Sequence, residues 1–229
     1  MALDFTERTA AGEAEGVLIL HHGRGSDEHD LIGLADVLDP DRRLHVLSPG
    51  GPLQLPGWPG RHWYSVPRVG YPDPETFWAA RTALAEFHDA AWERTGLSPE
   101  RTVLGGFSMG TVMSYTLGLS ADRPAPAGIL AFSGFVPTVE GWEPSLADRT
   151  GLRAFISHGR LDPVMDIAFA RSARGLLEGG GISVDYHESD AAHHIEPRVL
   201  PEAASWVAET LPRAPQPGAS TARRTDLGG

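Results

Sequence analysis

Short apolar runs that alternate with helical stretches are the feature of this 229-residue sequence that most restricts its fold. Apolar runs of strand length occur at residues 17–21, 44–48, 103–106, 128–132, 154–158 and 184–187. The intervening sequence predicts helices at residues 28–38, 75–95, 110–120, 166–178 and 201–211. Strands that alternate with helices form βαβ units, which build a parallel sheet covered on both faces. The sequence therefore predicts an α/β protein with a mostly parallel central sheet.

Two segments depart from this alternation. Residues 49–74 form a long connection rich in Pro and Gly. Such a connection either shapes a binding site or packs its aromatic side chains against the core, and the sequence leaves both alternatives open. Residues 212–229 are rich in Pro, Ala, Gly and Arg and lack periodicity, which is typical of a disordered tail. We therefore expect residues 1–211 to form a single domain.

The composition excludes several kinds of function. A net charge of −11 argues against a nucleic-acid partner and against binding to anionic membranes. The chain has no cysteine, so disulfides, thiolate metal sites and a cysteine nucleophile are excluded. It has no lysine either, which excludes Schiff-base chemistry on that residue. Residues 1–16 are polar and unlike a signal peptide, so we expect a cytoplasmic protein without membrane insertion.

Residues 106–110 read G-F-S-M-G and match the pattern G-x-S-x-G. The motif stands between a predicted strand and a predicted helix, where a sharp turn would project the hydroxyl of Ser108. Small flanking residues let the strand and helix approach closely, and the helix N-terminus favours negative charge beside the serine. The alternative is an ordinary strand-to-helix turn. The context favours Ser108 as a nucleophile.

A serine nucleophile needs a base, and the base needs a carboxylate that orients it. In α/β-hydrolases these groups follow the serine in the order Asp or Glu, then His. Asp162 stands in the turn after the predicted strand 154–158, where the carboxylate belongs. Its alternative role is a helix N-cap ahead of Pro163. The other aspartates weighed for this place are Asp166 in the next helix, Asp185 in a strand, and Asp190 after a different strand.

Two adjacent histidines, His193 and His194, follow the last predicted strand, and only one of them can face Ser108. Periodicity does not choose between them. A zinc site that joins them to His21 and His22 is the competing interpretation. Neighbouring residues of a strand point to opposite faces, so His21 and His22 could not both reach one ion. We therefore expect no metal site.

A serine that attacks a carbonyl group creates an oxyanion, which two backbone amides usually stabilise. The first expected donor is the N–H of Met109, directly after the serine. The second is the N–H of Arg24, in the glycine-flanked turn H-G-R-G at residues 22–25. A tight turn without a ligand is the alternative for this segment.

Several motifs together resemble the phospholipase/carboxylesterase family of α/β-hydrolases, which includes bacterial carboxylesterases and acyl-protein thioesterases. They are L-H-H-G-R-G at 20–25, S-P at 48–49, W-Y at 63–64, G-G-F-S-M-G at 105–110, F-S-G at 132–134, H-G-R-L-D-P-V at 158–164 and A-H-H-I at 192–195. The similarity runs from about residue 16 to residue 211. It implies an α/β-hydrolase fold without a large cap domain and a cofactor-free serine hydrolase, often dimeric. It also aligns His193 with the catalytic histidine.

The sequence departs from the family pattern at two positions. Met109 replaces a glutamine found in many members, although its backbone N–H would serve equally. Ala192 replaces the usual glycine before the catalytic histidine. Both changes leave the three catalytic candidates in place.

The leading hypothesis is a serine esterase for small-molecule carboxylic esters of short to medium acyl chains. Its catalytic residues would be Ser108, Asp162 and His193. A thioesterase or lysophospholipase, acting on acyl-CoA, acyl-protein or lysolipid, is the alternative. Acyl transfer and a non-catalytic ligand-binding relative are further alternatives, and a homodimer is left open. The candidate substrate contacts are Trp63, Tyr64, Leu53 and Phe135.

Overall fold

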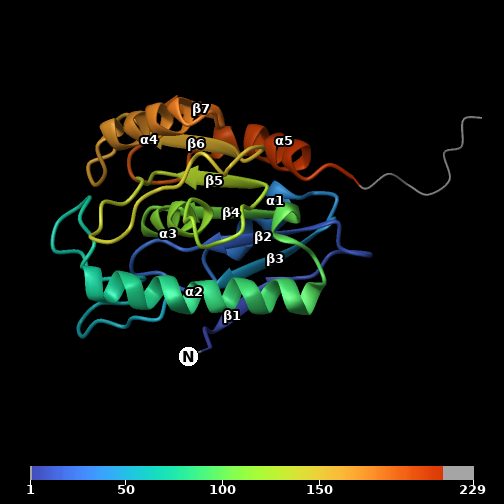
Figure 1. Cartoon of the computed structure of the whole chain (residues 1–229), viewed down its shortest axis with the longest axis horizontal. Coiled ribbons are helices and arrows are strands. Elements are labelled where there is room, and N and C mark those ends of the chain that lie inside the picture. The colour runs from blue at the N-terminus through green and yellow to red at the C-terminus, as the bar shows by residue number, and fades with distance from the viewer. Residues whose placement is uncertain (1, 214–229) are drawn as a thin grey trace, which may run out of the picture.

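The computed structural model describes residues 2–213, and its centre is a seven-stranded sheet in the order β1-β3-β2-β4-β5-β6-β7 (Figure 1). The strands are β1 (Phe5–Arg8), β2 (Gly16–His21), β3 (Leu44–Pro49), β4 (Thr102–Phe107), β5 (Gly128–Phe132), β6 (Arg153–Gly159) and β7 (Ser183–Ser189). All pairs are parallel except β1 with β3. The predicted α/β class with a mostly parallel sheet is confirmed.

Helices cover both faces of this sheet. The α-helices are α1 (Ala35–Leu38), α2 (Pro74–Thr95), α3 (Met109–Gly118), α4 (Ile167–Gly179) and α5 (Leu200–Thr210). Short 3₁₀ turns occur at η1 (Leu31–Leu34), η2 (Pro99–Arg101) and η3 (Pro197–Val199). The predicted helices that correspond to α2, α3, α4 and α5 agree with these bounds to within two residues. The expected tail at 212–229 lies, beyond residue 213, outside the described residues.

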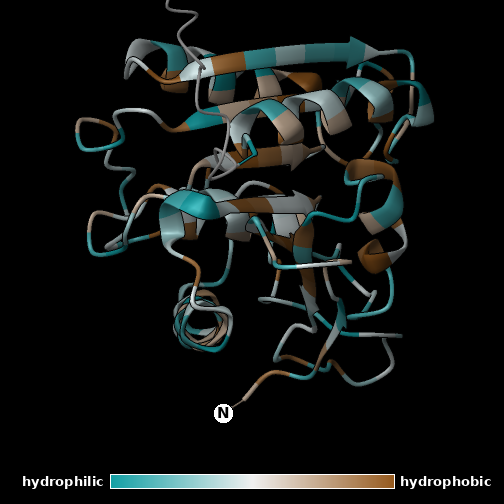
Figure 2. Ribbon diagram, turned by 90° about the vertical axis from the view of Figure 1, so that its right-hand side faces the viewer, coloured by the Kyte–Doolittle hydropathy of each residue, from teal (hydrophilic) through white to brown (hydrophobic). Residues whose placement is uncertain are grey.

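Two apolar cores form because side chains alternate across each strand. In β2, Val17 and Ile19 pack into the core that α2, α3 and α4 share, whereas Leu18 belongs to the core of α1 and α5. A strand covered on both faces therefore needs apolar residues at successive positions. Figure 2 shows this concentration of hydrophobic residues along the strands. It explains why the predicted apolar runs at 17–21, 44–48, 103–106, 128–132 and 154–158 fall inside observed strands. The run at 184–187 also lies in a strand, β7, although no residue of β7 is buried.

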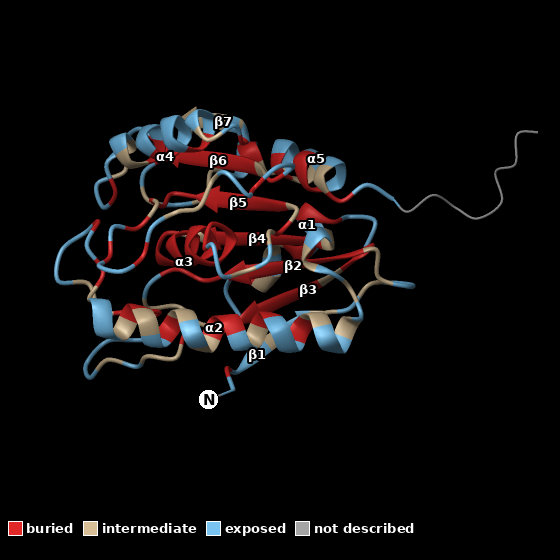
Figure 3. Cartoon of the chain, viewed as in Figure 1, coloured by how far each residue is buried: buried red, intermediate tan, exposed pale blue. Residues whose placement is uncertain are grey.

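The helices differ in how far they are buried, as Figure 3 shows. Every residue of α3 is buried, so its sequence is apolar or small all round. The longer α2 buries one stripe and exposes the rest. It begins where the side chain of Asp73 accepts a hydrogen bond from the amide of Thr76 at 3.0 Å. It ends at Gly96, whose φ of 67° suits glycine.

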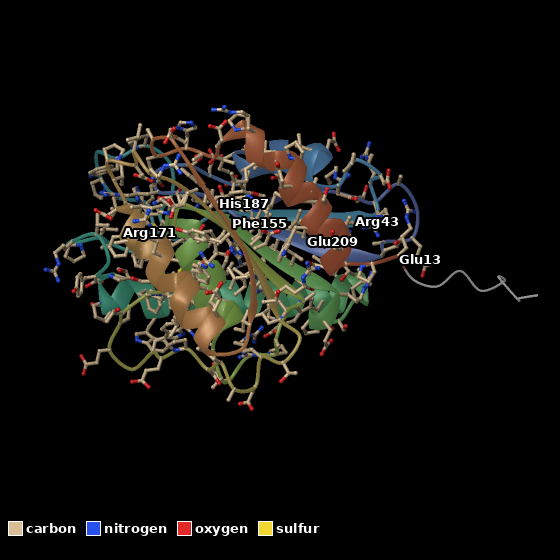
Figure 4. The ribbon with its side chains drawn as sticks, turned by 90° about the horizontal axis from the view of Figure 1, so that it is seen from above. Glu13, Arg43, Phe155, Arg171, His187 and Glu209 are labelled. Carbon is tan, nitrogen blue, oxygen red and sulfur yellow. The ribbon has the colours of Figure 1, made fainter. Side chains whose placement is uncertain are left out.

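The last strand extends the core through a ring contact. The imidazole of His187 on β7 stacks on Phe155 of β6, with ring centroids 4.6 Å apart (Figure 4). Phe155 in turn contacts Trp206 of α5 at 5.9 Å. These rings therefore link β7 through β6 to α5. Within residues 2–213, no helix is both long enough and apolar enough to cross a membrane.

Two sequence predictions needed correction, and one strand was missed. The helix predicted at 28–38 is reduced to η1 and the short α1, because turns occupy the preceding residues and Asp27 accepts from the amide of His29 at 2.9 Å. Strand β1 was not predicted, since this edge strand is half exposed and lacks an apolar run. Asp166 lies before α4 rather than inside it, and its side chain caps the amide of Ala168 at 2.8 Å.

A fully buried histidine pair predicts acid sensitivity. His21 Nε2 lies 3.1 Å from His88 Nε2, and His21 Nδ1 lies 2.8 Å from the hydroxyl of Ser114. Burial lowers the pKa of both rings, and the pKa of His88 falls to about 3 with a smaller contribution from the charge of Arg123. The folded chain therefore binds fewer protons than the unfolded chain below the ordinary histidine pKa of about 6.5.

The free energy of unfolding should consequently fall as the pH drops from 7 to 5. Denaturant titrations at several pH values measure the slope of the free energy of unfolding against pH. The slope should be shallower in His88→Gln, because one buried base is removed, and unchanged in the exposed control His29→Gln. An equal slope in His88→Gln and the wild type would contradict this account.

Candidate active site

Ser108 occupies a strained turn between β4 and α3. Its φ of 55° and ψ of −118° lie in a region that residues with a side chain rarely adopt. Hydrogen bonds hold the turn, because the Ser108 amide donates to Phe132 O at 2.9 Å and the Thr111 hydroxyl donates to Gly106 O at 2.6 Å. The turn therefore keeps a conformation that the chain would not adopt alone.

Two glycines let this turn pack against the neighbouring backbone. A Cβ atom on Gly110 would lie 1.9 Å from the carbonyl oxygen of His21, at the end of β2. A Cβ atom on Gly106 would lie 2.4 Å from the backbone of Gly110. Both glycines of the G-x-S-x-G pattern are thus required by close approach, as the pattern predicts.

The structure brings Ser108, His193 and Asp162 together. His193 Nε2 lies 2.9 Å from Ser108 Oγ, and His193 Nδ1 lies 2.6 Å from Asp162 Oδ2. The Phe107 ring lies against the His193 ring, with centroids 5.0 Å apart. His194 is exposed, and its amide donates to Ala192 O at 3.0 Å. Of the two adjacent histidines, His193 is therefore the one beside Ser108.

The buried carboxylate of Asp162 is held by backbone amides. Its Oδ1 accepts from the amides of Val164 at 2.8 Å and Met165 at 2.9 Å, while Oδ2 faces His193. Burial alone would raise the pKa of Asp162, but the amides and the ring outweigh burial and hold it below its ordinary value. An ionised carboxylate only accepts hydrogen bonds, so Nδ1 of His193 carries the proton. Nε2 is then free to accept from the Ser108 hydroxyl.

The remaining aspartates lie elsewhere. Asp166 caps α4, so Asp162 is not the N-cap of that helix. Asp185 pairs with His187 at 2.9 Å on β7. Asp190 is exposed and pairs with Arg160 at 2.6 Å. Neither of the last two carboxylates contacts His193.

The two amides expected to stabilise an oxyanion border the same cavity as Ser108. Met109 is the first residue of α3, where an amide has no acceptor inside the helix. Arg24 lies in the turn after β2, and its amide donates to no backbone carbonyl within residues 2–213. His22 fixes this turn, because its Nε2 accepts from the Gly51 amide at 2.8 Å and its Nδ1 donates to Gly23 O at 2.7 Å.

A cavity of about 270 Å³ opens beside Ser108. Its apolar lining consists mainly of Tyr64, Val66, Val69, Met109, Phe135, Val164 and Met165. Two of the expected substrate contacts, Tyr64 and Phe135, are therefore part of the wall. Figure 1 shows the connection before α2 at the end of the sheet to which the strand arrows point. Residue 66 and residues 68–72 of that connection border the cavity.

The other two expected substrate contacts, Trp63 and Leu53, need correction because they do not line this cavity. Trp63 is fully buried, and its indole N–H donates to His22 O at 2.9 Å. Leu53 forms a β-bridge with His62. Trp63 therefore fastens the connection 49–74 to the core, whereas the bridge of Leu53 joins two parts of the connection itself. The connection thus both packs an aromatic side chain against the core and lines the cavity, at different residues.

Sequence reasoning missed much of the cavity wall. Arg68, Val69 and Met165 belong to it but match no motif. The only sequence signal for Arg68 and Val69 was the unusual length of the connection that carries them.

The histidines of the alternative zinc site are dispersed. His21 bonds to Ser114 and His88, whereas His22 bonds to the backbone of Gly23 and Gly51. In the part of the chain that the structure describes, no three His, Asp or Glu side chains form a group that could hold a metal ion.

Comparison with known proteins identifies the family. The family described as Phospholipase/Carboxylesterase matches residues 7–211, so this chain belongs to it. The chain is 28% identical over 200 residues to the putative hydrolase MhqD of Bacillus subtilis, covering 87% of this chain and 96% of that protein. It is 31% identical over 199 residues to acyl-protein thioesterase 1 of Neurospora crassa, covering 77% and 79% of the two chains.

Solved structures share the same fold. The carboxylesterase of Bacillus cereus superposes with a TM-score of 0.80 at 24% identity, covering 91% of this chain and 94% of the other. The family and its members together support a hydrolase of the carboxylesterase and acyl-protein thioesterase type.

The contact between Gly110 and β2 predicts a large difference between two glycine substitutions. Gly110→Ala should lower the free energy of unfolding by more than about 2 kcal/mol, because the new methyl group meets backbone atoms that cannot move away. Gly175→Ala is the matched control in α4, where a Cβ atom meets nothing within 4 Å. That change should raise the free energy of unfolding by about 0.5–1 kcal/mol through helix propensity. Denaturant titration of both variants checks the pair, and equal stability would contradict the packing described.

Proposed function

We propose that this protein is a serine esterase that hydrolyses carboxylic esters through an acyl-enzyme on Ser108. The observation that carries the proposal is the chain of two hydrogen bonds from Ser108 through His193 to the buried Asp162, at 2.9 and 2.6 Å. A hydroxyl bonded to an imidazole that is oriented by a carboxylate is the arrangement that activates serine. The cavity beside Ser108 gives an ester access to it.

In the first half of the reaction, Ser108 Oγ attacks the ester carbonyl while His193 Nε2 accepts the serine proton. Asp162 stabilises the imidazolium through the proton on Nδ1. The amides of Arg24 and Met109 donate hydrogen bonds to the oxyanion. The C–O bond to the alcohol then breaks, and His193 returns the proton to the departing oxygen.

In the second half, a water molecule attacks the acyl group on Ser108. His193 accepts the proton of this water and then gives it to Ser108 as the acid departs. These steps use side chains and backbone amides alone, so the proposed reaction needs no metal or cofactor.

The cavity supports substrates with short to medium acyl chains. Its volume of about 270 Å³ falls just below the common range for ligand pockets, about 300–1,000 Å³. Its walls near Ser108 include the apolar side chains of Met109, Phe135 and Met165. A small apolar acyl group therefore fits this wall better than a long chain.

Thioester hydrolysis, including acyl-CoA and acyl-protein, and lysolipid hydrolysis remain the alternative function. The same three groups would attack a thioester carbonyl, and one relative of this chain is named an acyl-protein thioesterase. Butyryl esters and thioesters with matched leaving groups separate the two activities. A ratio of kcat/KM that favours the ester supports the leading proposal, and a ratio that favours the thioester supports the alternative.

Substitution of the two adjacent histidines tests the proposed base. Ser108→Ala and His193→Ala should each lower kcat on p-nitrophenyl butyrate by about 10⁴-fold, because serine and its base act as a unit. His194→Ala is the neighbouring control and should keep most of the activity. High activity in Ser108→Ala, or loss in His194→Ala with activity in His193→Ala, would refute the assignment.

Asp162→Asn tests the orienting carboxylate. The amide oxygen of Asn can still accept from Val164 and Met165, which leaves the NH₂ group facing His193 Nδ1. The ring would then carry its proton on Nε2, so kcat should fall by about 10⁴-fold with little change in Tm. Asp190→Asn removes an exposed carboxylate nearby and should keep the activity. A near-normal rate in Asp162→Asn would return Asp162 to a purely structural role.

A further inference from the structure

Two arginines border the candidate active-site cavity, and each lies on an aromatic ring. The Arg24 guanidinium lies 4.2 Å from the centroid of Trp58, and that of Arg68 lies 3.6 Å from the centroid of Tyr71. Both arginines contribute to the cavity wall and both are exposed. Two positively charged residues therefore line the cavity that Ser108 also lines.

These two arginines are unusual in this chain because they hold no anion. Within residues 2–213, each of the other arginines except Arg42 pairs with a carboxylate or bonds to a backbone carbonyl. The chain has 30 acidic residues and a net charge of −11, so carboxylates are abundant. Among the described residues, Asp30 is the only one with a carboxylate on the cavity wall, and it forms no ion pair with Arg24 or Arg68. Unpaired positive charge is thus concentrated at the cavity.

Stacking on a ring holds a guanidinium while leaving its donors free. When a ring contacts the face of a guanidinium, the N–H groups lie in the plane of the guanidinium and point outward. This planar set of donors matches the oxygens of a carboxylate or a phosphate. Trp58 and Tyr71 therefore hold Arg24 and Arg68 in a form that is ready to bind an anionic group.

We propose that the preferred substrate is an ester that carries an anionic oxygen group, a carboxylate or a phosphate, bound by Arg24 and Arg68. The inference rests on the proposed esterase function and names its substrate class. The charge can reside in the acyl part or in the alcohol part of the ester. In either case, the two arginines attract to the cavity a substrate that the net negative charge of the protein would otherwise repel.

Matched anionic and neutral esters test this preference. Monoethyl glutarate and ethyl 5-oxohexanoate differ by a charge in the acyl part, and 4-acetoxybenzoate and 4-acetoxybenzamide differ by a charge in the alcohol part. A further ester, 4-acetoxyphenyl phosphate, replaces the carboxylate by a phosphate. Proton release at constant pH measures kcat/KM for each ester, and the neutral ester of each pair is the internal reference.

The wild type should favour the anionic ester of at least one pair. Arg68→Gln and Arg24→Gln should each lower this anionic-to-neutral ratio roughly three- to tenfold, as expected for an exposed but well-oriented ion pair. Arg42→Gln is the matched control, since Arg42 is exposed and unpaired but does not line the cavity. It should leave the ratio unchanged. The proposal would be overturned if the anionic-to-neutral ratio of kcat/KM were one or less for both pairs of esters and equal in the wild type and the three variants.

A binding measurement separates this proposal from the proposed function. Calorimetric titration of monoethyl glutarate into Ser108→Ala should give binding that weakens in Ser108→Ala/Arg68→Gln, whereas ethyl 5-oxohexanoate should bind both proteins alike. If the neutral esters are hydrolysed through Ser108 without any preference for charge, the anionic subsite is refuted and the esterase stands. If no ester is hydrolysed, the esterase is refuted, and the titration alone decides for or against the anionic subsite.

Discussion

Parallel pairing of the strands from β3 to β7 is the constraint on which the site depends. Parallel strands end at the same edge of a sheet, so the segments that follow them meet there. His21 aligns with Gly106 and Gly159 aligns with Ser189, which brings the turns after β2, β4, β6 and β7 to one edge. Arg24, Ser108, Asp162 and His193 belong to these four segments. Residues distant in sequence therefore meet at one site without any insertion into the sheet.

Local interactions then fix each group at this edge. Ser108 retains a positive φ because Gly106 and Gly110 allow its turn to press against the end of β2. Asp162 remains ionised although its side chain is buried, because two backbone amides and His193 satisfy its oxygens. Both features are costly in isolation and are maintained by the surrounding structure.

The sequence predicted the sheet well because each of the strands β2 to β6 contains a run of mostly apolar, buried residues. It failed where that signal is absent, at the half-exposed β1 and at residues 28–38, where turns precede the short α1. The candidates Ser108, Asp162 and His193 were found because a motif or a strand end marked each one. Arg68 and Met165 line the cavity through the path of a loop, and no local pattern encodes that path. Trp63 was misplaced because an aromatic residue in a long connection suits a core and a binding site equally.

The central claim is that His193, oriented by Asp162, allows Ser108 to accept an acyl group. The most direct measurement is intact-protein and peptide mass spectrometry after rapid acid quenching of the enzyme with p-nitrophenyl acetate. The account predicts a mass increase of one acetyl group, located on the peptide that contains Ser108, which appears within the first turnover and decays when the ester is exhausted. An acetyl group found on a different residue, or steady hydrolysis in Ser108→Ala at the wild-type rate, would contradict it.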